Sequence, residues 1–193
     1  MSALATQHNA INLGQGFPDF ECDPRLIDAV SEAMRQGHNQ YPLMTGVPLL
    51  RERVAQKMEA IHGVRYDPQT DVTITSGATQ GILSAILAVV GAGDEVIVLE
   101  PCYDSYTPNI ELAGGVPVPV RLKPESFDVD WDALSAAITK QTRAIIVNSP
   151  HNPNLAMTNQ LSQTIPIARC PHASTRIVRT IDDDGAYLRR NCR

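Results

Sequence analysis

The sequence predicts an α/β fold in which a mainly parallel sheet carries helices on both faces. Strand patterns alternate with helix patterns between residues 72 and 150, as in consecutive βα units. Two of the strand patterns are continuous apolar runs, Val96-Ile97-Val98-Leu99 and Ala144-Ile145-Ile146-Val147. Such runs are typical of strands covered on both faces, and they favour a parallel sheet.

Two helices are predicted ahead of this alternation. Asp23 is a candidate N-cap, Pro24 occupies the first helical position, and Gly37 ends the pattern. Apolar residues recur between them at helical spacing: Leu26, Ile27, Val30 and Met34. The second helix runs from about Val47 to His62 and is ended by Gly63.

The strand and helix patterns then follow one another in order. Strands are predicted at residues 72–75, 95–99, 116–120 and 143–148, and helices from Ser76 to Gly91 or Gly93, from Pro101 to Leu112 and from Asp130 to Ile138. Pro117 and Pro119 argue against a central position for the third strand, because proline cannot donate to a strand ladder. A structure with an antiparallel sandwich or a helical bundle over residues 72–150 would contradict this fold.

The pattern changes after Asn154. No capped helix or clear strand follows, apart from one alternation of Ile177, Val178 and Ile181. We therefore expect three parts: an N-terminal arm and helix (1–45), an α/β domain (46–154) and a poorly ordered tail (155–193) that does not match the rest. A docked subdomain of unusual composition is the alternative for the tail.

Composition excludes several classes of protein. Of the 193 residues, 16 are basic and 21 acidic, so the net charge of −5 argues against nucleic acid and polybasic membrane surfaces as partners. No apolar run is long enough to span a membrane, and the first twenty residues do not read as a secretory signal. Cys22, Cys102, Cys170 and Cys192 are scattered, which is typical of reduced thiols in a cytoplasmic protein.

Three segments place polar residues where ligands of open α/β sheets gather. Ser76-Gly77-Ala78-Thr79 lies between a strand and a helix, where free N–H groups favour an anion. Taken alone, however, the segment favours the alternative that Ser and Thr only cap the helix. Glu100 to Tyr106 and Asn148 to Pro153 each leave the carboxyl end of a strand. Tyr103 can stack on a flat ring or cover the core. A fourth segment, around Gly14 and Gly16, lacks the third glycine and the helix of a dinucleotide-binding turn.

Five motifs together resemble those of fold-type I aminotransferases. They are Gly14-Gln15-Gly16-Phe17-Pro18-Asp19, Gln40-Tyr41-Pro42 with Thr45-Gly46, Ser76-Gly77-Ala78-Thr79-Gln80, Tyr103-Asp104-Ser105-Tyr106 and Ser149-Pro150-His151-Asn152-Pro153. Their order and spacing match over residues 1–153. Within these enzymes, which depend on pyridoxal 5′-phosphate (PLP), the sequence is most similar to the bacterial methionine aminotransferase and kynurenine aminotransferase group.

The resemblance implies a role for each matching position. Gly77, Ala78 and Thr79 would hold the cofactor phosphate, Tyr103 would stack on its pyridine ring, and Asn152 would bind its phenolic oxygen. Two further positions would meet the substrate: Gly16 would lie against its α-carboxylate, and Tyr41 would reach into the active site of the neighbouring subunit of a homodimer. The implied reaction transfers an amino group from an amino acid to a 2-oxo acid, with the PLP ring as electron sink.

Several motifs of the family have no counterpart in this sequence. The family's Schiff-base lysine motif, the Asp that pairs the pyridine nitrogen and two Arg positions find no counterpart after Asn154. The only lysines, Lys57, Lys123 and Lys140, lie outside that motif, so no catalytic residue is assigned. The sequence therefore predicts a truncated fold-type I large domain that is inactive as it stands. The alternative function is a non-catalytic fragment that binds phosphate ligands or associates with an intact homologue.

Overall fold

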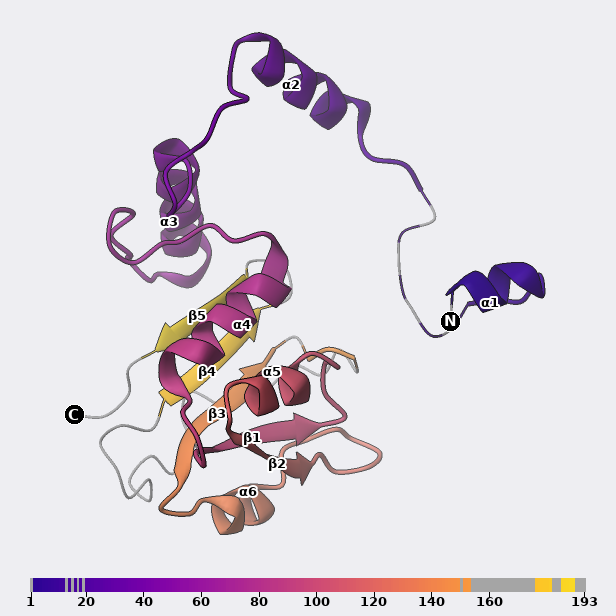
Figure 1. Ribbon diagram of the computed structural model, residues 1–193, viewed down its shortest axis with the longest axis vertical. Coiled ribbons are helices and arrows are strands. Elements are labelled where there is room, and N and C mark those ends of the chain that lie inside the picture. The colour runs from indigo at the N-terminus through magenta and orange to yellow at the C-terminus, as the bar shows by residue number, and fades with distance from the viewer. Residues whose placement is uncertain are drawn as a thin grey trace. The chain divides into compact units, whose positions relative to one another are not determined.

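The computed structural model describes residues 2–12, 14, 16, 18, 20–149 and 151–153, and the backbone alone of residues 176–181 and 185–189. The chain divides into two compact units, Met1–Val47 and Pro48–Arg193, and each is treated by itself (Figure 1). Within the described residues, no helix has the length and apolar character needed to cross a membrane.

The first unit contains two helices, α1 (Ser2–Gln7) and α2 (Pro24–Arg35). The N-terminus of α2 is confirmed as the sequence predicts it: Asp23 is the N-cap and its Oδ1 accepts a hydrogen bond from the Arg25 N–H at 2.9 Å. The short helix α1 was not predicted, since it lacks an apolar stripe of its own. The apolar stripe of α2 stays exposed, with Leu26, Ile27, Val30 and Met34 each more than half accessible to solvent.

The second unit is built around a five-stranded sheet. Its strands are β1 (Glu95–Glu100), β2 (Val116–Arg121), β3 (Thr142–Asn148), β4 (Arg176–Ile181) and β5 (Gly185–Arg189), in the order β2-β1-β3-β4-β5. Neighbouring strands from β2 to β4 are parallel, and β5 runs antiparallel to β4. The described part of this unit contains the helices α3 (Pro48–His62), α4 (Gly77–Val89), α5 (Tyr106–Leu112) and α6 (Trp131–Ala137).

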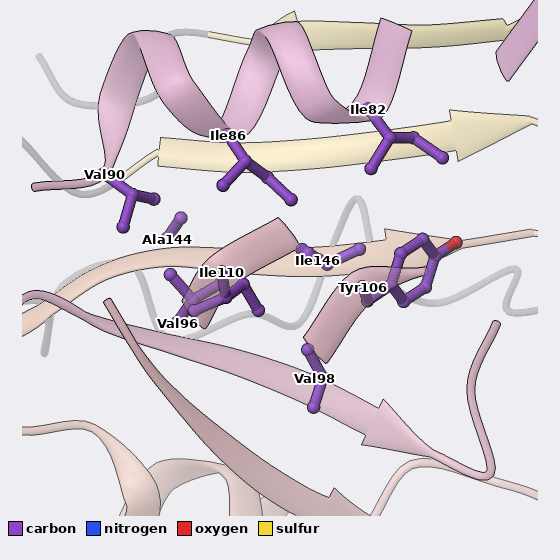
Figure 2. Packing of buried hydrophobic residues seen from close by; sticks show 9 residues of the cluster. All are labelled: Ile82, Ile86, Val90, Val96, Val98, Tyr106, Ile110, Ala144 and Ile146. Atoms are coloured by element: carbon purple, nitrogen blue, oxygen red, sulfur yellow. The ribbon is translucent and has the colours of Figure 1, made fainter. Parts of the chain in front are cut away.

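Helices cover both faces of this sheet, which confirms the predicted α/β class. One face of β1 and β3 packs against α4 and α5, and Figure 2 shows that cluster: Ile82, Ile86, Val90, Val96, Val98, Tyr106, Ile110, Ala144 and Ile146. The alternate residues of the same strands, Ile97, Leu99, Ile145 and Val147, pack on the other face with Leu134 of α6. The apolar runs are continuous because both faces are buried.

Two details of the sheet bear on the sequence predictions. The proline-containing strand β2 is an edge strand, as Pro117 and Pro119 indicated. The strand predicted at Val72–Thr75 is wrong, because these four residues belong to no strand of the described chain. A β-branched run becomes a strand only where a neighbour pairs with its N–H and C=O groups, and none of the five strands does so here.

The predicted tail, residues 155–193, lies mostly outside the described residues. Only the backbone of β4 and β5 is described there, and α4 lies along both strands (Figure 1).

Candidate functional site

The turn that leads into α4 gives this helix an unusual N-terminus. Ser76 has φ −77° and ψ 78°, and the Gly77 N–H donates to the Thr75 carbonyl at 2.9 Å, which together form an inverse γ-turn. Gly77 then adopts φ +78°, a conformation that glycine reaches without the steric cost of a side chain. The Ser76 side chain makes no capping hydrogen bond. The capping alternative for Ser76 is therefore not what the structure contains.

Two backbone donors remain available at this end of α4. The N–H groups of Ala78 and Thr79 lie in the first turn, where helix geometry provides no carbonyl four residues earlier. The helix dipole adds a partial positive charge at the same place. The Gly77 N–H, which the resemblance assigns to phosphate, is used by the γ-turn instead. The arrangement can bind an anion through Ala78 and Thr79.

Tyr103 lies next to this helix terminus. The segment after β1 places the Tyr103 phenol oxygen 3.3 Å from Thr79 Oγ1, so the structure brings together two residues that are 24 positions apart in sequence. The Tyr103 ring also packs edge-on against the buried Tyr106 ring, with centroids 5.8 Å apart and an angle of 78°. Tyr103 thus borders the core with one side and reaches the α4 terminus with its hydroxyl.

Asn152 follows β3, the strand next to β1. Because β1 and β3 are parallel neighbours, the segments carrying Tyr103 and Asn152 leave the same edge of the sheet. The Asn152 N–H donates to Asn148 Oδ1 at 2.5 Å, and Asn148, Ser149 and His151 are buried around this turn. Asn152 itself is half-buried. The hydrogen bond therefore holds the backbone at Asn152, while the side chain of Asn152 is partly accessible at the sheet edge.

The remaining predicted site residues lie in the first unit. Gly16 is exposed, and no heavy atom lies within 4 Å of where a Cβ would stand. Tyr41 is fully exposed. The roles that the resemblance gives these two residues stay predictions.

The three segments of the site, residues 76–79, 100–106 and 148–153, contain no lysine or arginine. Burial raises the pKa of the Cys102 thiol, and the carboxylates of Glu100 and Asp104 raise it further. All three lysines are exposed and lie elsewhere: Lys57 on α3, Lys123 after β2 and Lys140 before β3. No group of His, Cys, Asp or Glu in the described part of the chain could hold a metal ion.

A family model decides the relationship that these features suggest. The model described as aminotransferase class I and II matches residues 8–159. The chain belongs to this family. Among curated members of the aminotransferase family, methionine aminotransferase of Escherichia coli is 48% identical over 160 residues, which are 83% of this chain and 42% of that protein. A probable N-succinyldiaminopimelate aminotransferase of Mycobacterium tuberculosis is 44% identical over 182 residues, or 93% of this chain and 46% of its own.

Solved aminotransferase structures share the fold. A methionine aminotransferase from Escherichia coli superposes with a TM-score of 0.83 at 43% identity, over 93% of this chain and 47% of that one. The N-succinyldiaminopimelate aminotransferase from Mycobacterium tuberculosis gives 0.84 at 44% identity, over 94% and 47%. The chain therefore spans about half the length of the aminotransferases it matches. It has the fold of their amino-terminal part.

Gln80 and Thr75 also contribute to the site, although local sequence patterns predict no role for either residue. The Ser76 N–H donates to Gln80 Oε1 at 2.5 Å, and Thr75 Oγ1 donates to the Gly77 carbonyl at 3.0 Å. The signal available in the sequence was a Gln shortly after a Ser at a helix start, which resembles a capping box.

Proposed function

We propose that the N-terminus of α4, Tyr103 and Asn152 form the phosphate- and ring-binding half of a PLP site. The contact between Thr79 Oγ1 and the Tyr103 phenol at 3.3 Å carries this proposal, because it joins an anion-binding helix terminus to an aromatic ring. The half-buried Asn152 at the same sheet edge supplies an amide donor. Membership of the aminotransferase family, whose members depend on PLP, supports the choice of ligand.

Each residue has a defined task toward the bound group. The N–H groups of Ala78 and Thr79 and the Thr79 hydroxyl donate to the phosphate, and the Tyr103 ring covers the pyridine ring. The Asn152 amide donates to the phenolic oxygen. When bound, PLP supplies an electron sink for removal of the α-proton of an amino acid. Gly16 and Tyr41 would meet the substrate, Tyr41 from the neighbouring subunit of a homodimer.

The reaction of the whole site is transfer of an amino group from an amino acid to a 2-oxo acid, in the cytoplasm. The names of the similar proteins make methionine or an N-succinylated diamino acid suitable first substrates to assay. We expect the 193 residues by themselves to be inactive. Their three lysines are exposed and lie outside the segments that form the site, so no amine is positioned to form a covalent link or shuttle a proton.

A second function is supported by a different observation. Apolar side chains of the first unit are uncovered, among them Tyr41 and Met44, which are fully exposed. A non-catalytic fragment that associates with an intact relative would bury such side chains.

Titration of the purified chain with PLP tests the first proposal. We expect weak, reversible binding that is lost on dialysis, and a further loss of about fivefold in Thr79→Val, which removes one hydroxyl donor. Ser84→Ala, an exposed site on the same helix, is the matched control. Borohydride reduction followed by peptide mass spectrometry should find no single modified lysine. One uniquely modified lysine together with amino-acid turnover would show that the inactive interpretation is wrong.

A further inference from the structure

The turn before α4 is held by side chains as well as by its backbone. Gln80 reaches back across the first helical turn, so that its Oε1 accepts from the Ser76 N–H at 2.5 Å. This is the acceptor half of a capping box, displaced by one residue. On the other side of the turn, Thr75 Oγ1 donates to the Gly77 carbonyl at 3.0 Å, and it lies 3.2 Å from where a Cβ of Gly81 would stand.

These contacts divide the four N–H groups at the start of α4 into two pairs. The N–H of Ser76 is occupied by Gln80, and that of Gly77 by the Thr75 carbonyl. The N–H groups of Ala78 and Thr79 are left for an anion. The two N–H groups that can bind an anion are thus set in the ligand-free structure. The neutral side chain of Gln80 contributes by occupying the Ser76 N–H.

We propose that Gln80 is a positioning residue for the anion-binding turn. It keeps the Ser76 N–H occupied, holds Ser76 in the γ-turn and thereby aims the Ala78 and Thr79 donors at one point. This inference rests on the proposed function, since the anion concerned is the cofactor phosphate. Without the Gln80 oxygen, Ser76 is free to leave the γ-turn, and part of the binding free energy is then used to restore the turn.

Gln80→Met is the sharpest variant, because methionine keeps the length and helix propensity of glutamine but has no strong acceptor. Gln80→Glu keeps the acceptor and is used for the ligand-free measurement alone, because its charge repels an anion. Ser84→Ala, exposed on the same helix, controls for changes in helix stability. All variants are made in the full 193-residue chain.

Amide exchange and phosphate titration by NMR give two independent readouts. Without ligand, we expect the Ser76 amide to be protected in the wild type, Gln80→Glu and Ser84→Ala, and to exchange rapidly in Gln80→Met. With inorganic phosphate, the Ala78 and Thr79 amide signals should shift while Ser76 stays unchanged. The phosphate affinity of Gln80→Met should be about fivefold weaker, the contribution of one hydrogen bond.

The outcomes separate the inference from the proposed function. An unprotected Ser76 amide in the wild type overturns the positioning role, as does equal or tighter phosphate binding by Gln80→Met. Each of these results leaves phosphate binding at α4 intact. Wild-type Ala78 and Thr79 signals that respond to neither phosphate nor PLP overturn the proposed function, and the positioning role with it.

Discussion

At the scale of single residues, Asp94 connects the strands β2 and β3 with the turn after α4. Its Oδ2 accepts from the Gly91 N–H at 2.9 Å and from Arg143 Nε at 3.0 Å, while its carbonyl accepts from the Val116 N–H. The carboxylate therefore joins the turn after α4 to the start of β3. The Gly91 N–H is the largest cause that lowers the pKa of Asp94, and Arg143 adds to it against the opposing effect of burial.

A lowered pKa predicts a stability that depends on pH with a definite sign. Stabilisation by Asp94 is present above its unfolded pKa of about 3.9 and is lost as the pH falls through the folded value. Asp94→Asn should cost about 1 kcal/mol at pH 7 and less at pH 3, where part of the carboxylate's stabilisation is lost. Urea unfolding at both pH values measures this. Arg143→Met should retain much of the pH dependence, and a pH-independent cost in Asp94→Asn would contradict the assignment.

Cys102 carries a second prediction at this scale. Because burial and two neighbouring carboxylates raise the pKa of its thiol, little thiolate is present at pH 7.5. Cys102 should react with iodoacetamide at least about tenfold more slowly than the exposed Cys22. Peptide mass spectrometry at timed intervals reads each site separately, and in urea the two rates should converge. Equal rates in the folded chain would show that Cys102 is not shielded.

Residue patterns predicted the candidate site only in part. That Tyr103 and Asn152 share one sheet edge follows from where the patterns of β1 and β3 end, since parallel strands have their carboxyl ends together. The place of Thr79 does not follow in this way, because the strand predicted before it is absent. The 3.3 Å contact of Thr79 with Tyr103 depends on how α4 and the segment after β1 pack. The bond from Ser76 to Gln80 depends on one side-chain rotamer. Such details depend on tertiary packing, and the spacing of residues along the chain does not predict them.

At the scale of elements, the sequence was most informative where burial alone decides. The strands β1 and β3 were predicted from their apolar runs, and the prolines of β2 predicted an edge strand. Val72–Thr75 has equally good strand composition but pairs with no described strand. Strand propensity reflects fit to a pleated neighbour, so composition cannot say whether that neighbour exists.

The start of β2 offers an element-scale test of packing. A Cβ at Gly115 would stand 2.6 Å from Val90 Cγ1 and 3.1 Å from Ile110 Cγ2, both in the cluster of Figure 2. Gly115→Ala should therefore lower the free energy of unfolding by about 1–3 kcal/mol through overpacking. Gly91→Ala is the matched control, because the new Cβ would stand at an ordinary contact distance of 3.6 Å from Asp94 Oδ2. Denaturant unfolding compares the two, and equal stabilities would mean that α4 or α5 can shift freely.

At the scale of the whole molecule, we expect exposed apolar side chains to determine whether the chain self-associates. The chain spans about half the length of similar aminotransferases. The apolar stripe of α2, formed by Leu26, Ile27, Val30 and Met34, is more than half exposed. Surfaces of this kind promote association, so we expect the purified chain to self-associate or aggregate. A monodisperse monomer that melts cooperatively, observed by light scattering and calorimetry, would contradict this.

Substitutions on α2 separate apolar contact from net charge as the cause. Leu26→Lys with Val30→Lys removes half of the stripe and adds two positive charges to a net charge of −5. The lower net charge by itself would favour association, so a fall in assembly size by size-exclusion chromatography must come from the lost apolar surface. Asp28→Lys with Glu32→Lys brings the net charge still closer to zero and leaves the stripe intact, so assembly should persist or increase. If both pairs dissolve the assemblies equally, the stripe of α2 is not their cause.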